Sequence, residues 1–393
     1  MRRAPATPRS QLVVLAAGVV LAMSPWFATS AVLGELRDRW SIGTQEASWL
    51  VITVQLGFVA GAAISATTGL ADRIRPRRLV LLGAFGAAAA NALVVAGDSY
   101  GSALIYRSFT GAFLALVYPS AMKAMSGWFA TGRGMALGTM VGALTVGSAL
   151  PHLVNALGGF GWVPTLLTIS ALTVTGGLVV ELLGLPGPHL AAPQRFDPSR
   201  IGSLVRLRGF RLATLGYFGH MWELYAMWAW IAVFAGDVID SDRGASFFAF
   251  AVIGVGAAGS VHAGLVSDAQ GRATAARWAL SVSGAMALFV GFLVDAPLVV
   301  VVIPALIWGY AVVADSAQFS TIVSEEVPPE TAGTALTVQL ASGFVLSVAT
   351  IFLVPWARDV ASWGWAFALL APGPALGVWA MRQLEADRSR QPG

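Results

Sequence analysis

A histidine and a glutamate lie one helical turn apart in the segment GHMWELYAMWAW, residues 219 to 230. They are His220 and Glu223, and the run that contains them, 211 to 235, is otherwise apolar and aromatic. Such a run can cross a bilayer, where an ionisable side chain is costly unless it is paired or faces water. Glu223 could carry a proton with His220 as its hydrogen-bond partner, which is the role we favour. It could instead hold a cationic substrate, or form a structural pair with His220 or Arg107.

Two further ionisable side chains lie within apolar runs. Asp315 follows Trp308 by seven residues, so the two share a helical face, and Asp315 could be a second proton site or part of a gate. Arg107 could bind a substrate carboxylate or modulate a nearby acid, with a purely structural role as the alternative. The expected proton-coupling residues are therefore Glu223, Asp315 and Arg107.

Aromatic and polar side chains on the same helical faces complete the candidate site. Tyr217 and Trp230 share a helical stripe with Glu223, whereas Trp222 and Trp228 are expected to pack against lipid or the protein core. The side chains expected to contact a substrate are Trp26, Gln55, Arg107, Tyr118, Tyr217, His220, Glu223, Trp230, Trp308 and Asp315. Weaker candidates, which are more often interhelical hydrogen bonds than ligands, are Thr29, Ser30, His152, Asn155 and Gln339.

The elements that must position these residues are membrane-spanning helices. Of the 393 residues, 56% are hydrophobic and only 11% are charged, and the mean hydropathy is +0.73. This balance is typical of a membrane protein. Twelve windows are long and apolar enough to span a bilayer: 11 to 33, 46 to 68, 79 to 97, 101 to 125, 135 to 157, 162 to 184, 211 to 235, 244 to 266, 274 to 294, 297 to 322, 332 to 354 and 362 to 381.

Basic residues indicate the orientation. Most of the 24 Lys and Arg fall on one side of the predicted spans, the side that also holds both termini, and the positive-inside rule makes that side cytoplasmic. The net charge of +4 follows from this asymmetry and does not indicate a nucleic-acid partner. A cleavable secretory signal is the competing interpretation of the first window, which is too long for one. The chain has no Cys and therefore no disulfide or thiol chemistry.

The longest polar connection divides the chain into two parts of six spans each. We expect an N-terminal bundle over 1–185, a basic cytoplasmic linker over 186–210 and a C-terminal bundle over 211–393. An internal repeat supports this division, because GLADRIRPRR (69 to 78) follows the second span and GLVSDAQGR (264 to 272) follows the eighth. Two six-helix bundles related by an axis along the membrane normal are predicted.

This repeat resembles the Asp and Arg signature of the major facilitator superfamily of secondary transporters, and YRSFTG (106 to 111) resembles that family's arginine element in the fourth helix. The resemblance implies an all-α, twelve-helix fold and ties Arg107 to proton coupling. A carboxylate at the mouth of one helix can form a breakable latch with the end of a neighbouring helix. The expected gating residues are Asp72, Arg73, Arg77, Asp268 and Arg272; the alternative is that these loops only enforce topology.

The leading hypothesis is a secondary transporter of the cytoplasmic membrane. It would move a small organic solute by alternating access, coupled to protons, as a monomer and without a cofactor. A transition-metal transporter that uses His220, Glu223 and methionines is the main alternative. An intramembrane enzyme is disfavoured, because the chain lacks HExxH, GxSxG and any Cys nucleophile. The paired gate signatures also favour a carrier over a channel.

Overall fold

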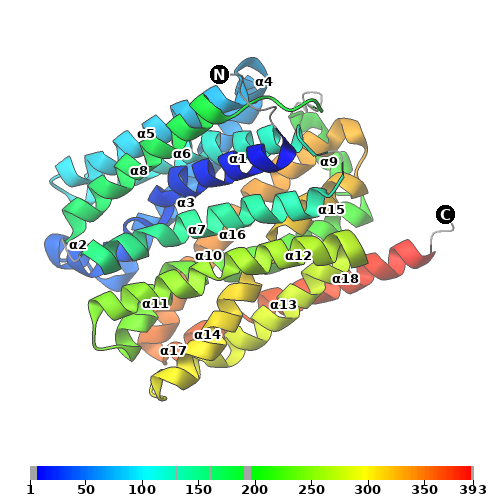
Figure 1. Cartoon of the computed structure of the whole chain (residues 1–393). Helices are drawn as coiled ribbons and strands as arrows, with labels where there is room; N and C mark the ends of the chain where they lie inside the picture. Colours follow the sequence, from blue (N-terminus) through cyan, green and yellow to red (C-terminus); the bar gives the residue numbers. More distant parts are fainter. Residues whose placement is uncertain (1–6, 130, 159–160, 190–195, 391–393) are drawn as a thin grey trace.

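The computed structural model describes residues 7–129, 131–158, 161–189 and 196–390, with only the backbone described at 71 and 72. All regular elements in these ranges are helical (Figure 1). The elements that precede the central connection are α1 (Pro8–Ala22), the 3-10 turns η1 (Ser24–Phe27) and η2 (Ser30–Val32), α2 (Leu33–Trp40), α3 (Thr44–Thr68), α4 (Leu70–Arg73), α5 (Pro76–Ala96), α6 (Tyr100–Ser126), α7 (Arg133–Gly158) and α8 (Trp162–Leu183).

The central connection contains η3 (Pro198–Arg200) and α9 (Ile201–Leu204). The elements that follow it are α10 (Arg208–Val238), α11 (Asp242–Gly254), α12 (Gly256–Gln270), α13 (Arg272–Phe289), η4 (Val290–Leu293), α14 (Leu298–Val312), α15 (Ser316–Glu326), η5 (Pro329–Thr331), α16 (Ala332–Val360), α17 (Trp363–Ala368) and α18 (Pro372–Arg390).

Each predicted window corresponds to one helix or to consecutive helical segments. In the described residues, ten segments are long and apolar enough to cross a membrane. The other two predicted spans are α6 and α10, which contain 27 and 31 residues. These two helices carry Arg107, His220 and Glu223, and such ionisable side chains lower the mean hydropathy of a helix. The all-α membrane fold that the sequence predicts is confirmed.

Helices on either side of the central connection pack mainly within their own group. In the first group α3 packs against α6, α5 against α6 and α8, and α1 against α7 and α8. In the second, α10 packs against α16 and α18, and α13 against α14 and α18. Between the groups, α7 packs beside α11 and α12, as Figure 1 shows, and α3 packs against α16. These two seams form the interface on which the candidate site lies.

Glycines allow the closest helix crossings. A Cβ atom at Gly138 of α7 would overlap the carbonyl oxygen of Ser260 on α12, and one at Gly111 of α6 would overlap that of Val54 on α3. On α7, glycines recur at every fourth residue, at Gly134, Gly138 and Gly142, and all three face α12. Small residues at such crossings are typical of membrane helices, whose association depends on close packing.

Replacing Gly111 with alanine is expected to destabilise the protein by ~3 kcal/mol, because the added methyl group meets backbone atoms that cannot move aside alone. The measurement is the midpoint of thermal unfolding in detergent. Gly34→Ala is the matched control, because Gly34 is exposed on α2 and its Cβ would meet nothing within 4 Å. Equal midpoints for the two variants would contradict the close crossing.

The connection between the two groups is tied to α16 by a capped turn. The Asp197 carboxylate accepts hydrogen bonds from the Ser199 hydroxyl (2.6 Å) and backbone N–H (3.0 Å) and pairs with Arg200 (3.1 Å). These partners lower the pKa of Asp197 below its ordinary value, the Ser199 bonds contributing most. The Asp197 backbone N–H donates to the Thr334 hydroxyl at 2.9 Å. Because the pKa is lowered, the turn keeps its bonds at neutral pH and loses them only in acid.

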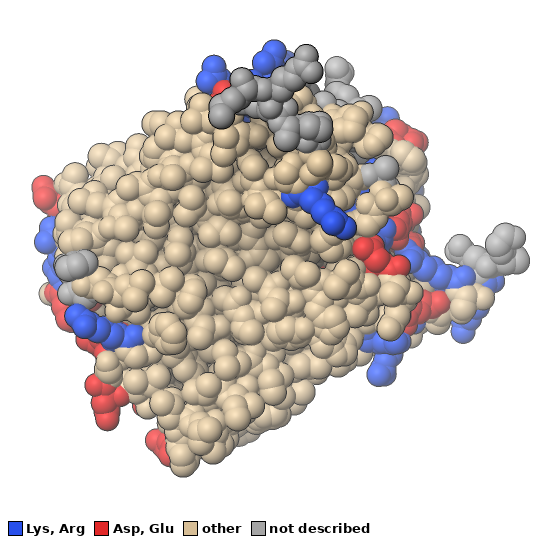
Figure 2. Space-filling view, viewed as in Figure 1, with Lys and Arg blue, Asp and Glu red and all other residues tan. Residues whose placement is uncertain are grey.

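Charged side chains gather at the opposite ends of the helices. Figure 2 shows Lys, Arg, Asp and Glu there, with a broad uncharged surface between them. The end that holds α4, α9 and the C-terminus is the one that the basic residues predict to be cytoplasmic (Figure 1). The uncharged band is the surface that a bilayer would cover.

Candidate functional site

Glu223 lies in the interior of the second helix group. It is 1% exposed on α10, its Oε1 accepts a hydrogen bond from the indole N–H of Trp308 on α14 (2.6 Å), and its Oε2 accepts one from the hydroxyl of Ser283 on α13 (2.8 Å). The carboxylate therefore joins three helices of one group. Glu223 and Trp308 are two of the predicted site residues, and their contact could not be predicted from their spacing in the sequence.

His220 and Asp315 form a second buried pair one turn away along α10. Their side chains are 1% and 2% exposed, and His220 Nδ1 lies 2.7 Å from Asp315 Oδ1. Asp315 lies at the break between α14 and α15, so its carboxylate is next to the N-terminus of a helix, where the helix dipole favours negative charge. An imidazole and a carboxylate at this distance can share or transfer a proton.

Arg107 is held by the first helix group. Its guanidinium donates to the backbone carbonyls of Pro25 (2.8 Å), Trp26 (2.6 Å) and Leu50 (3.3 Å), and to Asn91 Oδ1 (3.2 Å). The carbonyls of Pro25 and Trp26 belong to η1, where the helix changes from α to 3-10 geometry, and the Pro25 carbonyl also accepts from the Ala28 backbone N–H at 3.2 Å. These bonds join Arg107 to the first group, whereas the carboxylates of Glu223 and Asp315 bond within the second.

Replacing Arg107 with lysine is expected to destabilise the protein by ~3 kcal/mol. Lysine keeps the charge, but a single ammonium cannot replace a planar guanidinium that donates to four acceptors, so buried carbonyls lose their partners. The midpoint of thermal unfolding measures the effect. Arg243→Lys, at an exposed position on α11, serves as the control, and equal midpoints for the two variants would refute this anchoring role.

Six aromatic rings fill the centre of the interface between the two helix groups. They come from η1 and α3 on one side and from α10 and α16 on the other. Their ring centroids lie 4.9 to 6.3 Å apart, and all six side chains are buried. We call this set the interface aromatic cluster: Trp26, Phe27, Phe58, Tyr225, Trp228 and Phe344.

A polar contact lies beside the cluster. Ser347 on α16 donates a hydrogen bond to Gln55 Oε1 on α3, so the bond crosses between the two groups. Near the opposite end of the interface from Asp268, Asn155 of α7 donates to Ser246 of α11 at 3.0 Å and to the Ala31 carbonyl at 2.8 Å. The bonds from Ser347 to Gln55 and from Asn155 to Ser246 join the two groups.

The predicted substrate residues thus fall in separate places. Trp26 and Gln55 lie at the interface, whereas His220, Glu223, Trp308 and Asp315 lie inside the second group. Of the others, Tyr217 packs its ring beside His220 (6.1 Å) and Phe319 (6.1 Å), Trp230 donates to the Ile351 carbonyl (2.8 Å), and Tyr118 is half-buried on α6.

The sequence analysis did not select the other five members of the cluster. Trp228 was assigned to lipid or core packing, yet it is 1% exposed and lies edge-on to Phe27 of the first group, 5.8 Å away. The usable signal was the spacing of Met221, Tyr225 and Trp228, which form a stripe on nearly the opposite side of α10 from that of Glu223.

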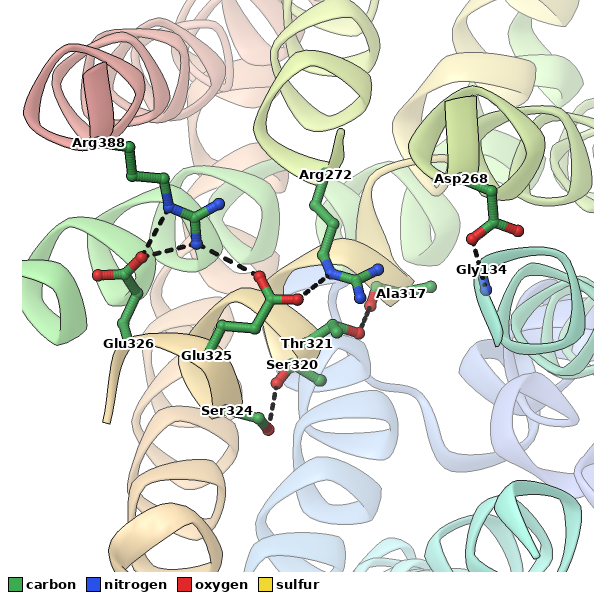
Figure 3. Close-up of polar contacts among 10 residues, drawn as sticks. All are labelled: Gly134, Asp268, Arg272, Ala317, Ser320, Thr321, Ser324, Glu325, Glu326 and Arg388. Atoms are coloured by element: carbon green, nitrogen blue, oxygen red, sulfur yellow. Dashed lines mark hydrogen bonds and ion pairs between the residues drawn. The ribbon is translucent and has the colours of Figure 1, made fainter. Parts of the chain in front are cut away.

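Asp268 bonds to the end of a helix in the other group. Its carboxylate accepts hydrogen bonds from the backbone N–H groups of Gly134 and Met135 at the start of α7, each 3.1 Å long. Figure 3 shows the bond to Gly134. These N–H groups have no partner within their own helix, and the helix dipole adds to the attraction. The contact therefore has the geometry of the charge and dipole latch that the sequence suggested.

A chain of ion pairs extends from the same loop. Arg272 pairs with Glu325 (2.7 Å), and Arg388 pairs with Glu325 (3.3 Å) and Glu326 (2.6 Å), as Figure 3 shows. These residues join the start of α13 to the ends of α15 and α18. The chain of pairs holds one end of the second group together without crossing to the first.

The first copy of the repeat is described in part. The side chain of Asp72 lies outside the described residues. Arg73 is exposed and Arg77 is half-buried at the end of the molecule where α4 lies.

Comparison with known proteins identifies the family. The profile of the Major Facilitator Superfamily matches residues 15–350, which is most of the chain. The chain belongs to the major facilitator superfamily. It is therefore a multi-pass membrane transporter rather than an enzyme, as the sequence predicted.

This facilitator superfamily protein also has a similar relative of known name. It is 32% identical over 155 residues to the multidrug efflux pump LfrA of Mycolicibacterium smegmatis. The similar segment covers 38% of this chain and 29% of that protein, so the chain spans less than a third of the length of the relative it matches.

The neighbours of the histidines that the structure describes indicate whether these could be metal ligands. Within the described ranges, no three His, Asp or Glu side chains come together in a way that could hold a metal ion. His220 faces Asp315, and His262 is paired with the Tyr310 hydroxyl at 2.7 Å.

Proposed function

We propose that this protein is a proton-coupled secondary transporter that moves a small organic solute across the cytoplasmic membrane by alternating access. The moving units would be the helix groups of 1–185 and 211–393, with both termini in the cytoplasm. The observation that carries the proposal is the buried carboxylate of Glu223, which joins α10 to α13 and α14 through two hydrogen bonds. A carboxylate buried at membrane depth is a typical proton site.

Proton binding at Glu223 would change the packing of α10. The ionised carboxylate accepts from Trp308 and Ser283, whereas the protonated acid carries a donor and accepts these bonds less strongly. The same helix presents Tyr225 and Trp228 to the first helix group. A shift of α10 upon protonation would therefore reach the interface directly, because these rings lie within two turns of Glu223. The His220 and Asp315 pair supplies a second site from which a proton could be exchanged.

The Asp268 latch would control one end of the interface. Its two hydrogen bonds to α7 hold the groups together there, and their loss would let that end open. Arg272 would keep the loop in place through Glu325. By the sequence repeat, Asp72, Arg73 and Arg77 would act at the corresponding position of the first group.

Two findings favour an organic solute over an ion. The centre of the interface is aromatic, and the named relative is a multidrug efflux pump. The latter also favours export as the direction, on the strength of a similarity that covers 38% of the chain.

The test is accumulation of organic solutes by reconstituted vesicles. Purified protein in vesicles is supplied with a panel of neutral, anionic and cationic aromatic solutes, with and without an imposed pH difference. At least one solute is expected to accumulate only when the pH difference is present, about tenfold per pH unit for one coupled proton. Equal distribution with and without the pH difference, for a solute that the protein transports, would contradict proton coupling.

A further inference from the structure

The interface aromatic cluster has a feature that packing does not explain. Three N–H donors in or beside the cluster find no acceptor among the described residues. They are Trp26 Nε1 and Trp228 Nε1 of the cluster, and Nε2 of Gln55, which lies one turn before Phe58 on α3. All three side chains are at least 98% buried. Buried N–H groups without acceptors are costly, so three of them on residues of one cluster and its neighbour call for an explanation.

The three groups all act as donors. An indole N–H can only donate, and the Gln55 carbonyl oxygen already accepts from Ser347, which leaves its NH2 group. Gln55 lies three residues before Phe58 on α3, so its side chain and that ring share a helical face. What the site lacks is therefore hydrogen-bond acceptors.

The charges around the cluster also favour a solute with acceptors over a cation. The guanidinium of Arg107 donates to the backbone carbonyl of Trp26, which places a buried positive charge next to the cluster. The buried carboxylates of the second group are directed elsewhere, since Glu223 bonds to Ser283 and Trp308 and Asp315 faces His220. Aromatic rings can attract cations, but a buried cation close by opposes this.

We propose that the interface aromatic cluster binds a planar aromatic solute that carries hydrogen-bond acceptors, and that it discriminates against planar cations that lack them. The inference rests on the proposed function, because it specifies the solute of that transporter. The ring faces would stack on the solute, while Trp26, Trp228 and Gln55 would donate to its carbonyl, carboxylate or ring nitrogen atoms.

The ring geometry fits such a solute once the helix groups move apart. Trp26 of the first group and Tyr225 of the second are stacked at 5.7 Å between centroids with 23° between their planes. A flat ring inserted between them needs about 3.5 Å more, one aromatic thickness. Because the two rings belong to different groups, a small separation of the groups would open this gap without unfolding either one.

The test compares two probes of nearly the same shape. N-methylacridone is neutral and carries a carbonyl acceptor, whereas N-methylacridinium is a cation without an acceptor. Binding of each to the purified full chain is measured by the fluorescence polarisation of the probe, without any gradient. N-methylacridone is expected to bind about tenfold more tightly or better.

Tryptophan variants locate the site. Trp228→Phe and Trp26→Phe keep an aromatic ring and remove the N–H, so each is expected to weaken N-methylacridone binding about fivefold, the effect of one neutral hydrogen bond. Trp222→Phe is the matched control on α10, because its indole N–H already donates to the Leu369 carbonyl at 3.0 Å. Trp222→Phe should bind N-methylacridone with the affinity of the wild type. A thermal melt of each variant establishes that it is folded.

Three results would overturn the inference: no binding of N-methylacridone, N-methylacridinium binding as tightly as N-methylacridone, or Trp26→Phe and Trp228→Phe binding like Trp222→Phe. Different results would contradict the proposed function. A protein that binds N-methylacridone but accumulates no solute under a pH difference would refute proton coupling alone. A protein that accumulates other solutes but does not bind N-methylacridone would refute the solute class alone.

Discussion

Replacing Glu223 with glutamine is expected to abolish accumulation of solute against its gradient while leaving exchange of solute across the membrane in place. Glutamine has nearly the same shape, and its carbonyl oxygen can still accept from Trp308 or Ser283, but it cannot take up and release a proton. In vesicles with one unit of pH difference, the wild type should accumulate solute about tenfold and the variant not at all.

The control for this variant is Glu181→Gln. Glu181 is a partly buried glutamate at the end of α8 that pairs with Arg78 at 3.5 Å, far along the chain from the proposed proton site. The Glu181→Gln variant should accumulate solute to the same extent as the wild type. Tenfold accumulation by Glu223→Gln would show that Glu223 does not carry the coupled proton. The His220 and Asp315 pair would then be the candidate proton site.

The second large effect is expected at the latch. Asparagine at position 268 loses the negative charge and one of the two acceptors that face Gly134 and Met135, at a cost of ~2 kcal/mol to the state in which this end is closed. The ratio of closed to open molecules should fall about thirtyfold. Because the chain has no native Cys, spin labels at Thr131 and Gln270, both exposed, can report the distance across this end.

The wild type should show one short distance and Asp268→Asn an added longer one. Asp387→Asn is the matched control, because Asp387 lies at the same end and pairs with Arg208 at 2.5 Å within the second group. It should keep the wild-type distance. An unchanged distance in Asp268→Asn would mean that the two hydrogen bonds do not hold the groups together.

The helices could be predicted from the sequence because a span in lipid must satisfy its own backbone, which makes each long apolar run helical. The breaks were harder to predict. Pro25 lies at the break in the first span, and Gly254 and Gly256 flank the one at Val255, but the residues between α14 and Asp315 include no proline or glycine. Tertiary packing decides such breaks, and it is not visible in a single span.

The chemistry of the site was predictable and its arrangement was not. The free-energy cost of placing an ionisable side chain in the bilayer identified Glu223, Asp315 and Arg107 as site candidates, and all three are buried. Which groups meet depends on the rotation of each helix, and about half a turn of rotation of α10 decides whether Glu223 or Tyr225 faces the interface. The pairing of His220 with Asp315 rather than Glu223 similarly depends on how α10 and α14 cross.

Proton movement driven by a solute gradient tests the central claim most directly. If protons drive the solute, then by thermodynamic reciprocity the solute must drive protons. Vesicles that contain the wild type and a pH-sensitive dye, with equal pH inside and outside, are given a gradient of the solute that accumulated in the first assay. The account predicts a change of internal pH in the wild type and none in Glu223→Gln. Transport of the solute by the wild type with no change of internal pH would contradict it.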